Sequence, residues 1–504
     1  MRLNPKIQAR YLFASLAAAL PAAATDWPQF GYDGTHSGSN TAETSITAAN
    51  VALLIPLYAA PATLAATVDS APVYKAGVMV NGTPKNLLFF LSNNGRVMAI
   101  DAATGTSVWS HTTTGNQPAT ASPAIDPNGQ FVYSYGIDGK AHKYKIDDGT
   151  ETTTGGWPQT ITLKTNVEKG ASGFTIANSG GTQYLVVVTD GYIGDGGNYQ
   201  GHLVSINLTT GTQNVFNTLC STLTTHLGTG DCTSAQSGIW GRGGATFVAA
   251  TGRVYIATGN GQYNANTGGH NWSDSVLALN VDGTGSGSGM PMDSYTPTNF
   301  QSLQDSDTDL GSISLAVLPV PSGSTVAHLG MQVGKDAKLR LIDLDDMSGQ
   351  GGPAHIGGEL QLLNVPQGGG GMREQPAVWV NPIDSSTWLF VGNGSGISGL
   401  KLGLNGSNLP QLSSQWNKST ASTSPILANG VLYSASSCTG GKCIVARNPL
   451  TGDVLWTSPN INGIHWQSPI LVDGAIYMTD NSSKLWKFGL NQPADLIFAN
   501  GFDG

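Results

Sequence analysis

Short apolar runs recur along the whole chain, and turn-forming residues separate them. The runs occupy residues 87–91, 131–135, 184–188, 254–258, 388–391, 430–433 and 475–478. Runs this short are typical of buried β-strands, because a helix is usually at least about ten residues long. The pattern therefore predicts an all-β protein.

The apolar runs belong to a repeated unit. Residues 97–101, followed by Thr104-Gly105 and Trp109, recur as residues 444–448, followed by Thr451-Gly452 and Trp456. Weaker copies lie at 141–149, 203–211, 276–283, 339–349 and 400–406, and an incomplete copy lies at 484–488. A repeat of this kind indicates one supersecondary unit used many times.

Each unit is predicted to form a strand, a turn, a second strand, a tight Gly-containing turn and a further strand. We expect the Trp that follows the tight turn to pack between neighbouring sheets. Units of this kind along the chain predict an eight-bladed β-propeller of four-stranded antiparallel blades, which hides its sheet edges by radial repetition. A stack of β-sandwich domains is the alternative, but it would need linkers that the sequence lacks.

Composition and charge narrow the possible classes of protein and partner further. With 23 basic and 32 acidic residues the net charge is −9, which disfavours nucleic acid and anionic membranes as partners. Charged residues make up only 11% of the chain and 67 of the 504 residues are Gly, so a helical bundle is a poor fit. The 39% of hydrophobic residues supplies a large core.

The N-terminus has the form of a secretory signal peptide. The basic residues Arg2, Lys6 and Arg10 precede an apolar stretch at 11–24. This stretch ends in the small residues of an A-x-A cleavage site. A membrane anchor is the alternative, but the stretch falls short of the ~20 residues that span a bilayer. We therefore expect residues 1–24 to be removed, and residues 25–504 to form one propeller domain in the periplasm or outside the cell.

Four cysteines fit an oxidising compartment. Cys220 and Cys232, and Cys438 and Cys443, are close in sequence, and neither pair has the C-x-x-C spacing of a zinc or redox site. Two local disulfides are predicted. The longer loop would contribute at most ~3 kcal/mol.

The Ala-x-Asp-x-x-Thr-Gly-x-x-x-Trp signature, together with Trp27-Pro28-Gln29-Phe30, resembles the pyrroloquinoline-quinone (PQQ) repeat family of eight-bladed propellers. The segment from Gly238 to Leu279 is similar to quinoprotein alcohol dehydrogenases, and closest to their polyvinyl-alcohol-dehydrogenase-like branch. The resemblance implies PQQ and calcium as cofactors. It also implies oxidation of a small or polymeric alcohol.

The resemblance assigns roles to individual residues. Trp240 would be the floor on which the flat quinone stacks, and Asn260 would be a calcium ligand through its amide oxygen. Asp309 would be the catalytic base that takes the alcohol proton and would also contact the metal, with Asp307 as the second choice. Lys335 would hydrogen-bond and polarise the quinone carbonyl.

The sequence also departs from the family pattern. The acidic calcium ligand is expected just before Gly201, whereas the nearest carboxylate, Asp195, is displaced by one position in a Gly-rich loop. The adjacent Cys-Cys pair that caps the quinone in many relatives is absent. There is no C-x-x-C-H haem motif, so electrons would pass to an external acceptor.

Structural alternatives exist for the same residues. Trp240 could be a blade-packing aromatic and Asn260 a turn residue, while Asp309 and Lys335 could be loop charges or a simple salt bridge. A non-catalytic secreted propeller that binds a protein or polysaccharide through its loops is the alternative function. An outer-membrane assembly factor is a third, because such propellers share the generic repeat.

Other motifs add little. No metalloprotease, hydrolase-elbow or nucleotide-binding motif is present, and the Gly runs at 283–289 and 368–371 are expected to be loops. His465-Trp466 is expected to be a buried structural pair rather than part of a central funnel. The tail at 497–504 is assigned no chemistry and could supply an outer strand that closes the ring.

Overall fold

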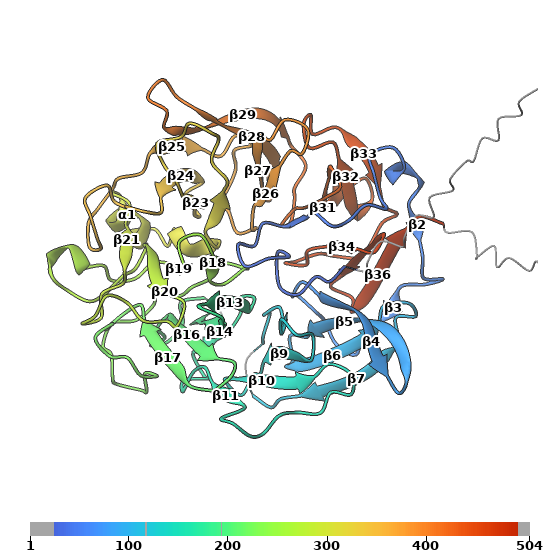
Figure 1. Cartoon of the computed structure of the whole chain (residues 1–504), viewed down its shortest axis with the longest axis horizontal. Coiled ribbons are helices and arrows are strands. Elements are labelled where there is room, and N and C mark those ends of the chain that lie inside the picture. Colours follow the sequence, from blue (N-terminus) through green and yellow to red (C-terminus); the bar gives the residue numbers. More distant parts are fainter. Residues whose placement is uncertain (1–24, 116–117, 193, 492–504) are drawn as a thin grey trace, which may run out of the picture.

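The computed structural model describes residues 25–115, 118–192 and 194–491. The predicted signal peptide and the tail at 497–504 lie outside these residues. Eight sheets are arranged radially around a central axis, as Figure 1 shows. The predicted eight-bladed β-propeller is confirmed, and the sandwich alternative is excluded.

In the first seven blades the four strands follow one another in chain order, and neighbouring strands are antiparallel; the eighth blade has three such strands and is completed from the N-terminal part of the chain. The first four blades are built as follows. They consist of β4 (Val73–Val80), β5 (Thr83–Leu91), β6 (Arg96–Asp101) and β7 (Ser107–Thr112); β8 (Ala124–Ile125), β9 (Phe131–Tyr135), β10 (Lys140–Lys145) and β11 (Gln159–Thr160); β13 (Thr175–Ser179), β14 (Thr182–Val188), β16 (His202–Asn207) and β17 (Gln213–Asn217); and β18 (Thr246–Val248), β19 (Arg253–Ala257), β20 (Val276–Asn280) and β21 (Asp293–Tyr295).

The remaining blades continue the pattern around the ring. They consist of β22 (Ala316–Leu318), β23 (Leu329–Val333), β24 (Lys338–Asp343) and β25 (Gln361–Asn364); β26 (Ala377–Val380), β27 (Thr387–Gly392), β28 (Ile397–Leu404) and β29 (Pro410–Lys418); β30 (Ile426–Ala428), β31 (Val431–Cys438), β32 (Gly441–Arg447) and β33 (Val454–Thr457); and β34 (Ile470–Val472), β35 (Ala475–Thr479) and β36 (Lys484–Gly489). First strands of neighbouring blades contact one another, so they lie innermost.

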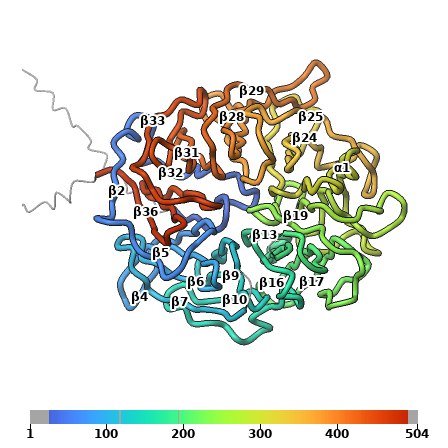
Figure 2. The backbone as a smooth tube through the Cα atoms, turned by 180° about the vertical axis from the view of Figure 1, so that it is seen from behind, coloured from blue at the N-terminus to red at the C-terminus, as the bar shows by residue number. Residues whose placement is uncertain are grey.

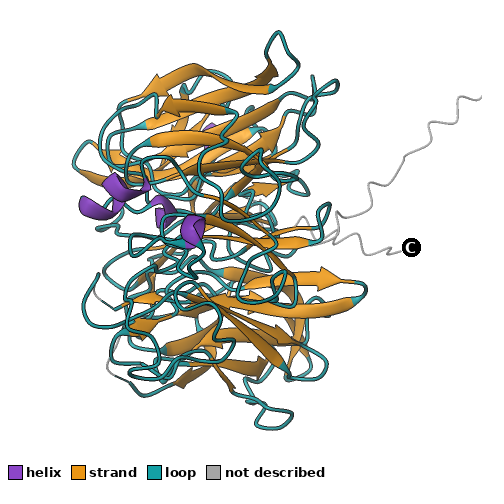
Figure 3. Ribbon diagram, turned by 90° about the vertical axis from the view of Figure 1, so that its left-hand side faces the viewer, coloured by secondary structure: helices purple, strands orange, loops and turns teal. Residues whose placement is uncertain are grey.

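Helical structure is confined to connections outside the blades, as the side view in Figure 3 shows. The helical elements are η1 (Val51–Leu53), η2 (Ala265–Thr267), α1 (Phe300–Asp305) and η3 (Leu310–Ser312). Among the described residues, no helix has the length and apolar character needed to cross a bilayer.

The apolar runs are the second strands of the blades. Residues 87–91 in β5 and residues 254–257 in β19 are buried on both faces. Each blade packs between two neighbours, so both faces of its middle strands meet other sheets. This explains why these strands are continuously hydrophobic and do not alternate.

The repeated Trp residues join neighbouring blades, as predicted. The indole Nε1 of Trp109 donates to the carbonyl of Ile146 in the next blade at 3.1 Å. Trp416 donates in the same way to the carbonyl of Pro449 at 2.9 Å. The motif therefore fixes the spacing between sheets as well as filling it.

The ring is closed by the N-terminal part of the chain. β2 (Ile55–Pro56) and β3 (Ala62–Thr63) both pair antiparallel with β36, the last strand of the eighth blade. Trp456 in the seventh blade donates from Nε1 to the carbonyl of Leu54, the residue directly before β2, at 3.2 Å. The first and last described parts of the ring are thereby held together.

Residues 27–40 cross the middle of the ring, as the blue segment in Figures 1 and 2 shows. Their carbonyl groups accept hydrogen bonds from first strands of several blades. The bonds run to Pro28 from Ile125 at 2.8 Å, to Gly34 from Phe247 at 2.7 Å, to Ser37 from Val378 at 2.8 Å, and to Gly38 from Leu427 at 2.7 Å. β1 (Ser39–Asn40) then pairs parallel with β30. This segment ties the inner strands together at the axis.

Both predicted disulfides are present. Cys220–Cys232 lies in the connection between the third and fourth blades, and Cys438–Cys443 closes the tip of the β31–β32 hairpin. No free cysteine occurs in the described part of the chain. Each bond therefore braces a local loop, as the sequence spacing suggested.

Candidate functional site

A cavity of about 590 Å³ lies at one end of the central axis. Its walls come from two kinds of segment, namely connections between successive blades and loops that follow second strands. In an antiparallel four-stranded blade both kinds leave the same end of the sheet. Its lining residues are Asp69, Asn93, Pro118, Thr120, Lys169, Ala171, Asp190, Gly194, Asp195, Trp240, Arg242, Asp307, Asp309, Ser312, Lys335, Arg373, His465 and Trp466.

Trp240 lies in the connection that leads into the fourth blade, and two glycines make room for its ring. A Cβ on Gly238 would approach the indole to 2.9 Å, and a Cβ on Gly259 would approach it to 2.8 Å. Tyr199 packs edge-on against the indole with ring centroids 5.9 Å apart. The ring is therefore fixed beside the cavity, and its buried Nε1 has no hydrogen-bond partner.

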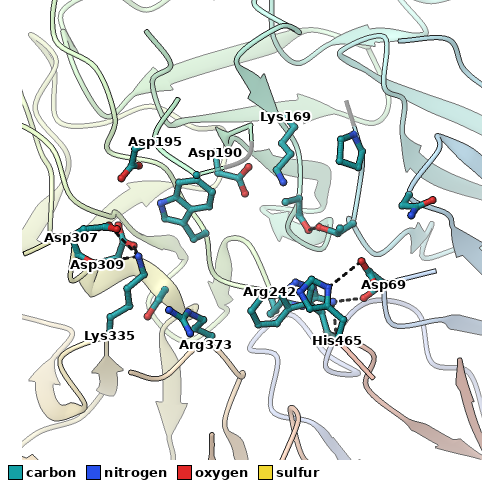
Figure 4. Close-up of a pocket in the computed structure, with 18 residues that line it drawn as sticks. Asp69, Lys169, Asp190, Asp195, Arg242, Asp307, Asp309, Lys335, Arg373 and His465 are labelled. Carbon is teal, nitrogen blue, oxygen red and sulfur yellow. Dashed lines mark hydrogen bonds and ion pairs between the residues drawn. The ribbon is translucent and has the colours of Figure 1, made fainter. Parts of the chain in front are cut away.

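Asp309 and Lys335 form an ion pair in the cavity wall, as Figure 4 shows. Lys335 Nζ lies 2.5 Å from Asp309 Oδ2 and 3.1 Å from Asp307 Oδ1. The backbone N–H of Lys335 also donates to the Asp309 carbonyl at 2.9 Å, which joins the two loops. Asp309 is buried whereas Asp307 is exposed, so the first-choice carboxylate is the one held inside the site.

Burial and the ion pair act in opposite directions on the pKa of Asp309. Burial raises the pKa of this carboxyl above its ordinary value, although Lys335 and the Asn260 N–H partly offset the rise. Burial alone would lower the pKa of Lys335, but Asp309 and Asp307 raise it. The site thus holds a lysine that stays charged next to a carboxylate with increased proton affinity.

Asn260 connects Asp309 to the displaced carboxylate Asp195. Its backbone N–H donates to Asp309 Oδ1 at 2.9 Å, and its side-chain Nδ2 lies 3.3 Å from Asp195 Oδ2. Tyr199 donates to the other oxygen of Asp195 at 2.5 Å. The amide Oδ1 of Asn260 is buried without a partner.

The predicted site residues are therefore brought together. Trp240, Asp195, Asp309 and Lys335 all line the cavity, and Asn260 lies directly behind them. Asp309 and Lys335 do form the salt bridge that the structural alternative allowed, but within the cavity rather than on a solvated loop. Among the described residues, no group of three or more His, Cys, Asp or Glu is arranged to hold a metal ion.

His465 and Trp466 correct one expectation. They line the cavity, and the His465 side chain is 54% exposed, so the interpretation as a buried structural pair is wrong. His465 Nδ1 lies 3.3 Å from Asp69 Oδ2. The pair lies in the connection into the last blade, and such connections form the cavity wall.

Sequence reasoning missed five charged residues in the wall, namely Asp69, Lys169, Asp190, Arg242 and Arg373. The sequence did carry a signal for one of them. Asp190 follows the apolar run at 184–188, and Asn260 likewise follows the run at 254–258. Residues just after second strands face the axis, so this position could have identified Asp190.

Comparisons with known proteins agree with this architecture. Residues 61–242 match a family model of PQQ-type repeats described as outer membrane protein assembly factor BamB. No curated protein matches the sequence.

Solved structures match over nearly the whole chain at low identity. The quinohemoprotein alcohol dehydrogenase of Comamonas testosteroni is 16% identical with a TM-score of 0.62, covering 94% of this chain and 82% of its own. A quinohemoprotein alcohol dehydrogenase of Pseudomonas putida HK5 is 15% identical with a TM-score of 0.60, covering 94% and 81%. A europium-containing methanol dehydrogenase is 13% identical with a TM-score of 0.61, covering 92% and 98%. Residues 61–242 thus match a PQQ-type repeat model, and the chain as a whole shares the propeller fold of these quinoprotein dehydrogenase structures.

Proposed function

We propose that the protein is an exported alcohol dehydrogenase that uses PQQ and calcium and passes electrons to an external acceptor. One observation carries the proposal. Trp240, Asn260, Asp309 and Lys335 come from separate loops and meet at one edge of a single cavity. Their expected roles were assigned from the sequence resemblance alone. A shared location is what those roles require.

The oxygen donors around Asn260 suit a hard divalent cation. Asp195, Asp309 and Asn260 are linked by the two hydrogen bonds of Asn260, and the Asn260 Oδ1 atom is buried without a partner. Rotating the Asn260 amide exchanges the positions of oxygen and nitrogen and would turn Oδ1 toward Asp195. Two carboxylates and one amide oxygen would then hold Ca²⁺, which prefers such ligands.

The rest of the cavity suits a flat anionic cofactor. Trp240 offers an aromatic surface in the cavity wall, and Gly238 and Gly259 leave room for its ring. Lys169 and Arg373 line the same space, and no ion pair of either is found among the described residues. A planar tricarboxylate such as PQQ matches an aromatic floor with basic groups around it.

Asp309 is suited to take the hydroxyl proton of an alcohol. Its raised pKa increases its proton affinity, and the Asn260 N–H fixes Oδ1 in place. When Asp309 accepts the proton, Lys335 can keep Asp307 as its partner and direct its charge into the cavity. Bound PQQ would supply the two-electron acceptor for oxidation of the carbinol carbon.

The acceptor, substrate and compartment belong to the same proposal. The sequence has no haem-binding motif, so the electrons would leave to a separate acceptor. The resemblance to the polyvinyl-alcohol-dehydrogenase-like branch favours a secondary or polymeric alcohol. Two disulfides support an oxidising compartment, in line with the signal-like N-terminus.

The test is a titration of purified protein with PQQ, with and without Ca²⁺, followed by tryptophan fluorescence and then by dye reduction with alcohols. Asp309→Asn should lose dye reduction and keep PQQ binding, whereas Trp240→Ala should lose PQQ binding. Asp345→Asn is the matched control, because Asp345 is an exposed carboxylate paired with His328 at 2.8 Å.

The outcomes separate the candidate functions. Calcium-dependent quenching of tryptophan fluorescence together with alcohol-dependent dye reduction supports the dehydrogenase. Absence of PQQ binding at about 50 µM, which is weak for a cofactor site, would favour a non-catalytic propeller that binds a partner through its loops.

A further inference from the structure

Asp190 is a buried carboxyl group in the cavity wall, and the proposed function assigns it no role. It lines the cavity, its side chain is 1% exposed, and neither of its oxygens has a hydrogen-bond partner. Figure 4 shows it beside Lys169 and apart from the group formed by Asp307, Asp309 and Lys335. A buried carboxyl in this condition is costly unless a ligand or a proton compensates it.

A small ladder outside the eight blades presents this side chain. β12 (Glu168–Lys169) pairs antiparallel with β15 (Asp190–Gly191), and Lys169 lies directly opposite Asp190 in the register. Side chains of directly opposed residues point to the same face of a ladder. Lys169 and Asp190 therefore face the cavity together.

The rear of the ladder is anchored in the protein. Glu168 alternates to the opposite face and is fully buried, where Lys164 Nζ lies 2.7 Å from its Oε1. The Gln200 N–H donates to the same oxygen at 2.9 Å, and the Thr162 hydroxyl donates to the other. The hydrogen bonds and the ion pair of Glu168 thus fix the position of the ladder that carries Lys169 and Asp190.

Basic groups surround Asp190 without pairing with it. No ion pair joins Asp190 to Lys169 or to Arg242. The Arg242 guanidinium is held by the carbonyls of Asp69 and Trp466 at 2.7 and 3.2 Å, and its buried Nε has no partner. The titratable groups that act on Asp190 are Lys169 on β12, Arg242 from the connection into the fourth blade, Tyr135 on β9 and Tyr199 from the loop after β15.

We propose that the Lys169–Asp190 ladder binds a carboxylate of the cavity ligand, and that this carboxylate binds together with one proton shared with the Asp190 carboxyl. Lys169 and the Arg242 Nε–H supply donors, which select an anionic acceptor. A ligand carboxylate next to an ionised Asp190 would be repelled, whereas a protonated Asp190 donates a hydrogen bond to it. The identity of that ligand as PQQ rests on the proposed function.

The electrostatics of the cavity support the shared proton. Burial raises the pKa of Asp190 to about 7, although Lys169 and Arg242 act to lower it. A proton is therefore available at this position near neutral pH. Ordinary carboxylates of a ligand are already ionised there, because their pKa values lie near ~4.

The experiment measures binding and proton uptake by calorimetry between pH 6 and 9, in phosphate and in Tris, which have different ionisation enthalpies. The probes are PQQ and benzene-1,3,5-tricarboxylate, a flat tricarboxylate without a quinone. The wild type should take up close to one proton per ligand at pH 8, and its affinity should fall about tenfold for each pH unit above about 7.

Variants at the ladder make the prediction specific. Asp190→Asn keeps a hydrogen-bond donor, so it should bind both probes without pH dependence in this range and without proton uptake. Lys169→Met should weaken binding about tenfold or more at every pH. Lys401→Met is the matched control, because Lys401 pairs with Asp384 on the outside of the sixth blade and should have no effect.

The outcomes distinguish this inference from the proposed function. If the tricarboxylate binds with a proton and PQQ does not, the ladder is confirmed and the PQQ assignment fails. If PQQ binds and Asp190→Asn keeps the wild-type pH dependence, the inference is overturned alone. If neither probe binds the wild type, both are overturned. Should Asp190→Asn not fold, the wild-type proton count decides, and a count of zero at pH 8 overturns the inference.

Discussion

Replacing Asp190 by Asn should stabilise the free protein at neutral and higher pH. The folded-state pKa of Asp190 is raised from 3.8 to about 7 because the carboxyl is buried. The folded protein therefore holds this proton more tightly than the unfolded chain does. The contribution to stability is fully present below about pH 4 and is lost as the pH rises to about 7.

The size of the effect follows from the pKa difference. A rise of about three pKa units corresponds to at most about 4 kcal/mol. A chain of this length has an unfolding entropy of about 1 kcal/mol/K, so 4 kcal/mol corresponds to about 4 °C in Tm. The Tm of Asp190→Asn should therefore equal that of the wild type at pH 4 and exceed it by up to about 4 °C at pH 8.

The assay is differential scanning calorimetry of ligand-free wild type and Asp190→Asn at pH steps from 4 to 8. Asp384→Asn is the control, because Asp384 is exposed and its replacement should leave the Tm difference nearly constant with pH. A difference between wild type and Asp190→Asn that does not change across this range would refute the reasoning. It would mean that Asp190 is solvated or ion-paired in the folded protein.

Three further predictions concern the site and the ring. Gly259→Ala places a methyl group against the Asp309 carboxylate and the Trp240 indole, so the proposed PQQ binding, measured by fluorescence, should be lost. Gly406→Ala adds a methyl group in open space and should bind normally. Trp456→Ala removes a buried indole that joins the seventh blade to the N-terminal segment, so it should cost about 3–5 kcal/mol and lower the Tm by a similar number of degrees. Cys220→Ser with Cys232→Ser should lower the Tm by no more than about 3 °C, and a larger loss would show that this disulfide supports more than its loop.

The fold could be predicted from the sequence because each repeat has the same local pattern of strands, turns and Trp. Residues 97–109 and 444–456 each encode two strands and a tight turn, and the Trp at the end of each unit packs onto the next blade. Strand length, turn chemistry and the interblade Trp are local properties, so they can be predicted without knowing how the ring is assembled. The two disulfides were predictable for the same reason.

The candidate site could be predicted only in part. Trp240, Asn260, Asp309 and Lys335 were found because they lie in motifs that resemble a family with a known order of site residues. Their meeting in one cavity was not contained in those motifs. It depends on the alternating strand direction that sends inter-blade connections and second-strand loops to the same end of every blade.

What the sequence by itself determined is therefore the blade, and with it the strands, the turns, the packing Trp and the local disulfides. The tertiary structure alone decided how the ring closes, since β2 and β3 pair with β36 across almost the entire chain. It also decided that Asp190 and Lys169 face the cavity and that burial raises the pKa of Asp190. The reason is that burial and charge environment depend on residues brought together from many blades, whereas hydrophobic periodicity depends only on neighbours along the chain.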